Sequence, residues 1–479
     1  SIDTTESVDS LKTLYDTGET NAYTITITSN AADTQLSTAA EFNAINNATS
    51  VAVNATSVTA LASSNISDIK TLLTAGNDTD QFTATSFSSL ATVAVADSTL
   101  DVSDLNDSIA QANTATGATS TGFTISSGGT INGGTAAEFT TLLGYESGSQ
   151  ISISNQNLTV DSGTMTVANA VAFSATTSGT VTGEITSGTT ISAMLDSSSG
   201  LKDTGTTATQ ALTITVASGD AEATAANLTS LYGKTTVAVD ASAVTEITGS
   251  VAEANIVYAA GASEITGLGN ETVVTTDTSL SDVTTLNTLD GNTTGTVNAA
   301  SVNSITGTLA KLLTAYGSNG ITGLGNETIS VSDTGGGSSL AASDLNSLDS
   351  KTSGTITTAN GLETLTGTVA ALNTAYGSAG LSIQGDEAIT ISDTTVDAEA
   401  LNNLNNYTSG VIDADTLTKV TGTLADVNVA FAADAASSAT ISGLGDQDVE
   451  LTDTNVLAAD LNTLNGYTLG TVDASTVAV

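Results

Sequence analysis

The phrase "ITGLGNETISVSDT", residues 321–334, decides the fold because the chain repeats it. Variants of it begin at Ile265, Leu381 and Ile441, so that the copies follow one another at nearly constant spacing. Two further phrases recur between these copies, "GTLAKLLTAY" at 307–316 and "LNTLDGNTTGTVNA" at 286–299. A period of about 56–60 residues predicts a repeat architecture instead of separate globular domains.

Each repeat has two similar halves, and each half has the pattern of a strand followed by a short helix. In one half, Ile329 and Val331 alternate with polar residues before the wider spacing of Leu340, Leu345 and Leu348. In the other half, Val297 and Asn298 come before Val302, Ile305, Leu309, Leu312 and Leu313. A change of period from 2 to 3 or 4 predicts a strand and then a helix.

The composition indicates a thin core. Only 3% of the 479 residues are aromatic and none is proline, yet 39% are hydrophobic and the mean hydropathy is +0.16. Small and β-branched side chains suffice when each coil of a solenoid stacks on the last. We therefore expect a mainly β protein with short helices, either an elongated β-solenoid or an α/β-solenoid. A coil of about 29 residues and one of about 58 both remain open, because strands stack at about 4.8 Å and helices at about 8–10 Å.

The repeats divide the chain into three expected regions. Residues 1–37 are the least repetitive and predict an N-terminal cap or joint, residues 38–233 carry degenerate repeats, and residues 234–479 carry clear ones. Between about 116 and 219 the glycine, serine and threonine content rises, which favours a more β-rich stretch.

The charge limits the partners. Seven Lys+Arg against 50 Asp+Glu give a formal net charge of −43. Such a surface lacks the basic footprint that nucleic acid requires and attracts cations instead. No segment approaches the roughly 18 apolar residues of a membrane span, so we expect no membrane insertion. The chain opens at Ser1 without a signal-like segment, which predicts a processed chain or a piece of a longer one.

The inventory of side chains argues against catalysis. Histidine and cysteine are absent, and the acidic residues recur once per repeat, whereas an active site is normally built once. Paired carboxylates could still hydrolyse glycosides, but we expect no enzyme and no catalytic residues.

The repeated acids are better candidates for calcium ligands, because calcium takes about six to eight oxygens. The alternative is that they cap helices or form Asx-turns. The candidate positions are Asp277, Asp333, Asp393, Asp453, Asp413 and Asp473.

The repeated aromatic residues also allow two interpretations. They could be a platform on which sugars stack, or a buried ladder, which we favour because each follows an apolar helical pattern. These residues are Tyr258, Tyr316, Tyr376 and Phe431.

The three phrases together resemble the repeats of very large cell-surface proteins of marine picocyanobacteria, clearly over 234–479 and faintly before. The resemblance implies an exported protein associated with S-layers, sheaths, filaments or motility. We therefore expect a structural subunit that assembles with itself at the cell surface, with divalent cations or surface polysaccharide as further partners. An adhesin or carbohydrate-binding solenoid is the alternative, and a phage fibre shaft a weaker one.

Overall fold

The computed structural model describes residues 8–11, 14, 21–27, 37–333 and 337–477. Over these residues the fold is mixed α/β, with short helices between strands of parallel sheets. The chain divides into two compact units, one of Ser1–Val244 with Ala260–Leu268 and one of Thr245–Ala259 with Gly269–Val479. Most of the expected N-terminal cap, 1–37, lies outside the described residues.

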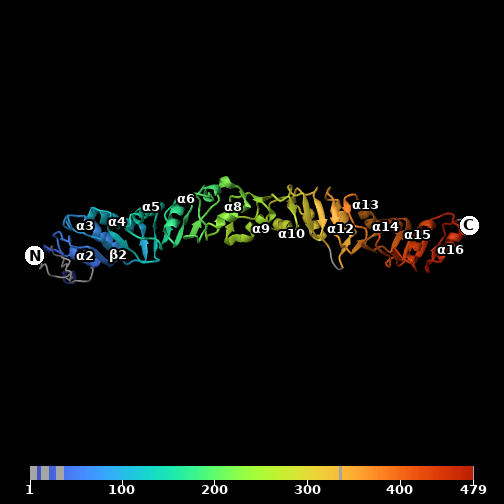
Figure 1. Ribbon diagram of the computed structural model, residues 1–479, viewed down its shortest axis with the longest axis horizontal. Coiled ribbons are helices and arrows are strands. Elements are labelled where there is room, and N and C mark those ends of the chain that lie inside the picture. The colour runs from blue at the N-terminus through green and yellow to red at the C-terminus, as the bar shows by residue number, and fades with distance from the viewer. Residues whose placement is uncertain (1–7, 12–13, 15–20, 28–36, 334–336, 478–479) are drawn as a thin grey trace. The chain divides into compact units, whose positions relative to one another are not determined.

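The first unit alternates helices and strands almost one for one (Figure 1). Its elements are α1 Val8–Leu11, α2 Ala39–Asn47, β1 Ala60–Ser64, α3 Ile66–Gly76, β2 Thr92–Val95, β3 Thr99–Asp101, α4 Val102–Thr116, β4 Gly122–Thr124, β5 Thr130–Gly134, α5 Ala136–Ser147, β6 Asn157–Val160, α6 Val167–Thr176, β7 Thr180–Glu184, α7 Ile191–Met194, β8 Thr209–Thr213, η1 Ser218–Asp220, β9 Glu222–Thr224, α8 Ala225–Tyr232, β10 Val239–Asp240, η2 Gly261–Ser263 and β12 Ile265–Thr266.

The second unit has shorter strands and more regular helices. Its elements are β11 Glu246–Gly249, α9 Val251–Ala260, β13 Thr272–Thr275, β14 Ser279–Leu280, α10 Thr284–Asn292, β15 Val297–Asn298, β16 Ser304–Gly307, α11 Leu309–Gly317, β17 Ile321–Thr322, β18 Thr328–Val331, β19 Ser339–Ala341, α12 Ala342–Asp349, β20 Ile356–Thr358, β21 Thr364–Gly367, α13 Val369–Gly377, β22 Leu381–Ser382, β23 Ala388–Ile391, β24 Thr395–Asp397, α14 Ala398–Tyr407, β25 Ile412–Asp413, β26 Lys419–Gly422, α15 Leu424–Ala435, β27 Ile441–Ser442, β28 Asp448–Leu451, α16 Ala458–Asn465 and β29 Val472–Asp473.

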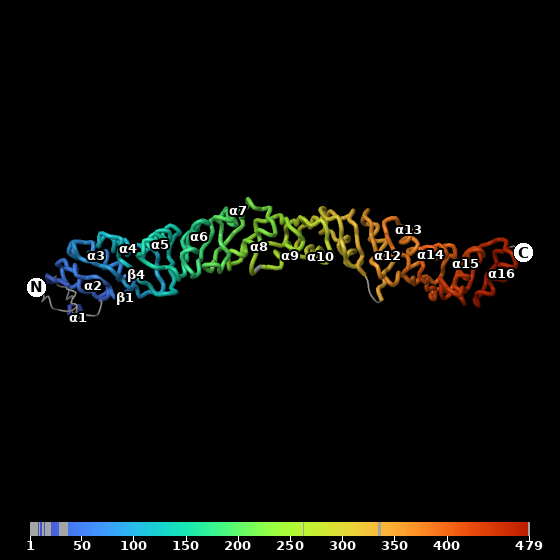
Figure 2. The backbone as a smooth tube through the Cα atoms, viewed as in Figure 1, coloured from blue at the N-terminus to red at the C-terminus, as the bar shows by residue number. Residues whose placement is uncertain are grey.

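Most strands of the second unit pair in parallel with the second strand that follows them in the chain. We call the stretch between two paired strands a layer. The register places like residues side by side: Ile305 pairs with Ile329, Ile329 with Ile356, and Ile356 with Leu381. All four side chains are buried. Because successive side chains of a strand point to opposite faces, the apolar residues of the alternating sequence pattern form this buried row. Figure 2 shows the chain winding through successive layers within each unit.

In the second unit, the strands of one sheet do not keep the same position relative to the helices from one layer to the next. The sheet β19-β21-β23-β25-β27 begins with a strand that leads directly into α12. Its middle strand, β23, is separated from the next helix, α14, by β24, and its last strand follows α15. The number of residues between a strand of this sheet and the nearest helix therefore changes from one layer to the next.

Asparagine side chains tie each helix to the next in the row formed by α12, α13, α14 and α15 (Figure 1). Nδ2 of Asn346 in α12 donates to the main-chain oxygen of Ala371 in α13 at 2.9 Å. The same bond recurs one layer on, from Asn373 to Ala400 at 2.9 Å. In α11 the equivalent position is Leu313, so the series is interrupted there.

The stretch between 116 and 219 contains more helix than its composition indicates. Helices α5 and α6 lie within it, and only α7, four residues long, is reduced to a single turn. Thr135 and Thr166 form capping boxes with Glu138 and Asn169, so that side chains at the start of α5 and α6 satisfy orphan amides. Capping and buried apolar residues support these helices despite the high content of small polar residues.

Candidate functional site

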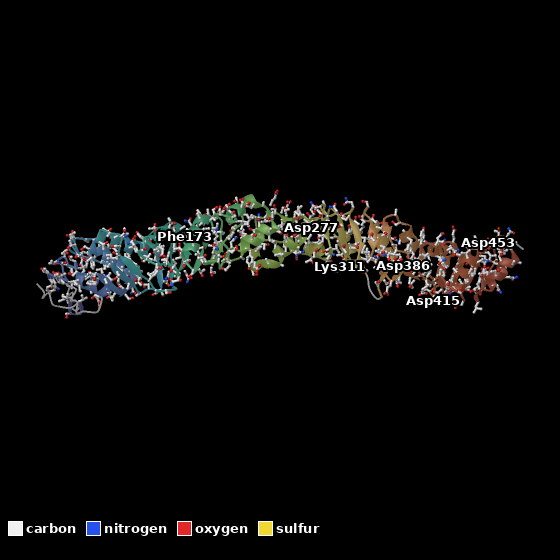
Figure 3. The ribbon with its side chains drawn as sticks, viewed as in Figure 1. Phe173, Asp277, Lys311, Asp386, Asp415 and Asp453 are labelled. Carbon is white, nitrogen blue, oxygen red and sulfur yellow. The ribbon has the colours of Figure 1, made fainter. Side chains whose placement is uncertain are left out.

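The four aspartates that follow "ISVS"-type strands lie at equivalent positions in the layers. Each is half-buried, and its Oδ2 accepts a hydrogen bond from the first amide of a helix in the preceding layer. The distances are 2.6 Å for Asp277 to Val251 N, 2.7 Å for Asp333 to Leu309 N, 2.7 Å for Asp393 to Val369 N and 2.6 Å for Asp453 to Leu424 N. A carboxylate at a helix N-terminus satisfies an orphan amide and the helix dipole together. These aspartates do cap helices, but the helix lies 24 to 29 residues earlier in the chain. Figure 3 labels Asp277 and Asp453, the first and last of the four.

Two aspartates of the first unit make the same bond. Oδ2 of Asp97 accepts from Ile66 N at 2.6 Å, and Oδ2 of Asp220 accepts from Ile191 N at 2.8 Å. Neither is among the positions predicted from the repeats. For Asp97 a signal existed, since it ends the alternating run Val93, Val95, Asp97 just as Asp333 ends its own run.

Asp413 and Asp473 have a different local role. Oδ1 of Asp413 accepts from the amide of Asp415 at 3.1 Å, and Oδ1 of Asp473 from that of Ser475 at 2.9 Å, which are Asx-turns. The hydrogen bond from the Ser475 amide lowers the pKa of Asp473. These turns place Thr416 so that its hydroxyl donates to the main-chain oxygen of Asp393 at 2.9 Å. The two sets of aspartates therefore belong to neighbouring layers that are joined by hydroxyl groups.

These hydrogen bonds limit the number of oxygens that the aspartates can offer to a calcium ion. One carboxylate oxygen of Asp277, Asp333, Asp393 and Asp453 is already committed to a helix amide. Across the described residues, no three or more acidic side chains gather into a group that could hold a metal ion. Since calcium needs about six to eight oxygens, an ion bound to one of these carboxylates needs oxygens from elsewhere.

Buried glutamates are a feature that the sequence analysis missed. Glu271, Glu327 and Glu387 end the "GLGNE"-type loops and have exposed fractions of 0%, 0% and 2%. The amide of Gly325 donates to both oxygens of Glu327, at 3.0 and 2.8 Å, and the amide of Asn326 donates at 3.2 Å. Gly325 has a φ of +144°, a conformation that glycine adopts most readily, and this directs its amide at the carboxylate. A buried carboxylate is stable only when donors of this kind replace water.

A tyrosine hydroxyl completes each buried carboxylate. Oη of Tyr316 donates to Oε2 of Glu327 at 2.6 Å, and Oη of Tyr376 donates to Glu387 at 3.2 Å. Burial, followed by the neighbouring carboxylate, raises the pKa of both tyrosines. The recurring order of tyrosine and then Gly-Asn-Glu, 11 residues apart in this repeat, was the available signal.

The aromatic positions are therefore not equivalent platforms for sugar. The hydroxyls of Tyr258, Tyr316 and Tyr376 bind buried glutamates, and Phe431 is 1% exposed. Tyr407 is different, since its ring stacks on Tyr376 with centroids 5.8 Å apart and is 47% exposed.

No family model matches the chain, and no curated protein matches it. Among the residues that the structure describes, no helix combines the length and the apolar character needed to cross a membrane.

Proposed function

We propose that this chain is a solenoid in which each coil is one layer, that is, the stretch of chain between two paired strands. We also propose that it is a structural subunit of an extracellular filament, sheath or surface layer. In this proposal, copies assemble with one another through their acidic repeats and no reaction is catalysed.

The observation that carries the proposal is the recurrence of the same bonds between layers. The aspartate-to-helix bond, the asparagine-to-carbonyl bond and the threonine-to-carbonyl bond each join one layer to the next. Each layer therefore presents hydrogen-bonding groups to which a further layer of the same kind can bind. Interfaces of this type extend by repetition, which suits a scaffold better than a site that is built once.

The net charge of −43 sets the condition for assembly. Adjacent copies repel each other, and salt screens this repulsion beyond about 8 Å at physiological ionic strength without creating a bond. Calcium held between carboxylates of two copies supplies such a bond, since within the described part of one copy no three acidic side chains gather into a group that could hold the ion. Binding only to the assembled form then stabilises the assembly by mass action.

Sedimentation velocity tests this function. We expect large species in millimolar calcium and smaller ones after EDTA at constant ionic strength. The triple variant Asp333→Asn, Asp393→Asn, Asp453→Asn removes three charges but keeps an acceptor oxygen for each helix amide. It should weaken calcium-dependent assembly, and it should lower the melting temperature of the unassembled chain only slightly, because each helix N-terminus keeps its hydrogen bond and loses only the charge. The matched control is the triple variant Asp386→Asn, Asp415→Asn, Asp446→Asn, which removes the same three charges from exposed aspartates outside this set. Assembly that is indifferent to both EDTA and the triple variant rejects the role of calcium.

A second candidate function, carbohydrate binding at a cell surface, is favoured by one observation. The exposed ring of Tyr407, held parallel to Tyr376 at an interplanar angle of 7°, offers an aromatic face of the kind on which sugars stack. Pull-down with insoluble polysaccharides should retain the chain and lose it on Tyr407→Ala, with Tyr467→Ala as the control. Equal retention of both variants argues against a platform at Tyr407.

A further inference from the structure

Asn-Gly pairs lose the side-chain amide of asparagine more readily than other sequences, because glycine has no side chain to hinder the main-chain nitrogen that follows the asparagine. The chain contains four such pairs, at 132–133, 319–320, 360–361 and 465–466. In this reaction the glycine nitrogen attacks Cγ of the asparagine, so the nitrogen has to be free and the space around it open. The four pairs differ in both respects.

Three of the four pairs are protected, because in each of them the glycine amide already donates a hydrogen bond. The acceptors are Oδ2 of Asp161 for Gly133 at 3.1 Å, Oγ of Ser318 for Gly320 at 2.9 Å, and the main-chain oxygen of Thr463 for Gly466 at 3.0 Å. Carboxylates also crowd two of these glycines, namely Asp101 at Gly133 and Asp290 at Gly320. A glycine nitrogen held in this way can attack only after the local structure opens.

The pair at 360–361 is free and open. It lies in the turn between β20 and β21, in the part of the chain between α12 and α13 (Figure 1), and both of its residues are exposed. The amide of Gly361 makes no hydrogen bond with any residue that the structure describes. Beyond its chain neighbours, no atom lies within 4 Å of the position that a Cβ of Gly361 would take. The nitrogen therefore has room to approach the side chain of Asn360.

A neighbouring side chain favours attack at this position. Nε2 of Gln384 donates a hydrogen bond to Oδ1 of Asn360. A donor at this oxygen draws electron density away from Cγ and stabilises the negative charge that develops on the oxygen as the nitrogen attacks.

The turn is unusual among its counterparts. Nine positions separate Ile356 in β20 from Leu365 in β21, whereas eight separate Ile412 from Val420 in the next repeat. The additional residue falls at the Asn-Gly pair, and Gly361 accommodates it with a φ of +100°, a conformation that side chains other than glycine rarely adopt. The reactive pair is therefore a local departure from the repeat.

We propose that Asn360 is a site of spontaneous modification, at which the folded chain converts asparagine to aspartate or isoaspartate. The nitrogen of Gly361 forms a bond to Cγ of Asn360 and gives up its proton to hydroxide or water. The bond from Cγ to Nδ2 then breaks, and ammonia leaves a cyclic imide behind. Water opens the imide at one of its two carbonyl carbons, which gives aspartate or isoaspartate. Water is the sole co-reactant, and nothing is oxidised or reduced.

The modification changes the contact between two layers. Either product adds one negative charge to the formal −43, and isoaspartate also lengthens the backbone by a methylene group directly before Gly361. The main-chain oxygen of Gly361 accepts from Oγ of Ser338 at 3.3 Å, and the amide of Glu363 donates to the same hydroxyl at 3.1 Å. Ser338 leads into β19, which pairs with β21. Isoaspartate therefore displaces the hydrogen bonds that tie this turn to the preceding layer.

Peptide mapping by mass spectrometry tests the proposal on the full chain. Trypsin cleaves after lysine and places the four pairs on four different peptides, 71–202, 312–351, 352–419 and 420–479. After incubation of the folded chain at mildly alkaline pH, Asn360 should be converted about tenfold faster than the other three asparagines, which react only through local opening. In urea all four should react at similar rates, because the structure no longer protects any of them.

Asn360→Gln is the matched control, since it keeps an amide on a longer side chain that closes a less favourable ring. It should abolish the conversion in peptide 352–419 and leave the other three peptides unchanged. Conversion of another pair as fast as Asn360 in the folded chain, or an Asn360 that reacts in urea but not in the folded chain, would overturn the proposal. The same preference for Asn360 in urea would also overturn it, because local sequence would then set the rate.

Asn360→Asp tests the consequence for the layers, because it supplies the charge without the longer backbone. Hydrogen exchange in β19 and β21 should be faster in the isoaspartate form than in Asn360→Asp. Equal exchange in the two forms would reject the loosening of this contact.

Discussion

The second and last copies of the "GLGNE"-type loop fill the same buried position with different side chains. In the copy at 321–334, Glu327 is fully buried and accepts from two main-chain amides and from Tyr316 Oη. In the copy that begins at Ile441, the tyrosine is replaced by Phe431 and the glutamate by Gln447. Nε2 of Gln447 donates to the main-chain oxygens of Leu417 and Gly443, at 3.2 and 2.6 Å.

The difference shows what the loop requires. Where a tyrosine hydroxyl is present, the slot holds a carboxylate; where it is absent, the slot holds an amide that brings donors of its own. A carboxylate beside a phenylalanine would be buried with fewer donors, which is costly for a charged group. The tyrosine and the glutamate therefore act as one unit, although they belong to different phrases of the repeat.

The largest loss of stability should come from removing one partner of the tyrosine–glutamate pair. Tyr316→Phe removes the 2.6 Å bond to Glu327 and leaves the buried carboxylate with main-chain donors only. We expect a loss of about 2 kcal/mol in the free energy of unfolding, the usual range for a hydrogen bond to a charged group. Urea unfolding followed by circular dichroism measures it. Tyr376→Phe, whose bond is 3.2 Å long, should cost less.

Restoring the combination found in the last copy should recover part of this loss. In the background of Tyr316→Phe, Glu327→Gln should raise stability by about 1 kcal/mol, because the amide no longer needs the missing donor. In the wild-type background the same Glu327→Gln change should destabilise. If both backgrounds respond alike in a double-mutant cycle, the two side chains are independent and the comparison has no physical basis.

Breaking the bonds between layers should have a smaller effect. Asp393→Ala removes the acceptor for the first amide of α13 and should cost about 1 kcal/mol, as for other helix caps. Asp413→Ala, which opens only a local Asx-turn, is the matched control and should cost less. Hydrogen exchange should place the loss in α13. A larger effect of the control would mean that the helix cap contributes little.

The smallest effect should be on the alkaline limb of the stability curve. The pKa of Tyr316 is raised on folding, chiefly by burial, above its ordinary value of 10.0. Its contribution is therefore complete below about pH 10 and is lost as the pH rises further, because the unfolded chain ionises first. At pH 10.5 the difference for one tyrosine is below about 1 kcal/mol. Melting temperatures of the wild type and Tyr316→Phe should converge above pH 10; parallel curves would exclude a raised pKa.

The periodic parts of the fold were accessible from the sequence. Alternation placed Ile329 and Val331 inside, and both are fully buried in β18. Spacing placed Leu345 and Leu348 on the buried face of α12. Leu340, which has the same spacing, instead lies in β19, before α12 begins at Ala342. The pattern of the other half of the repeat was also misleading in part. The spacing of Val302, Ile305 and Leu309 imitates a helix, but Ile305 lies in β16 and the helix begins only at Leu309.

The parts that could not be predicted depend on contacts between layers. The helix that Asp333 caps begins 24 residues earlier, so sequence proximity pointed to the wrong helix. The burial of Glu327 was missed because its donors are main-chain amides of its own loop and the hydroxyl of Tyr316, which belongs to a different phrase of the repeat. The reduction of α7 to four residues was also not predicted, because the composition of that stretch indicated a general loss of helix.

Electron microscopy of the purified chain tests the central claim most directly. At high concentration in millimolar calcium, the account predicts filaments or sheets in which the chain repeats regularly, and their dissociation after EDTA. A field of separate, uniform particles under both conditions would contradict the proposal that this protein is a self-assembling structural subunit.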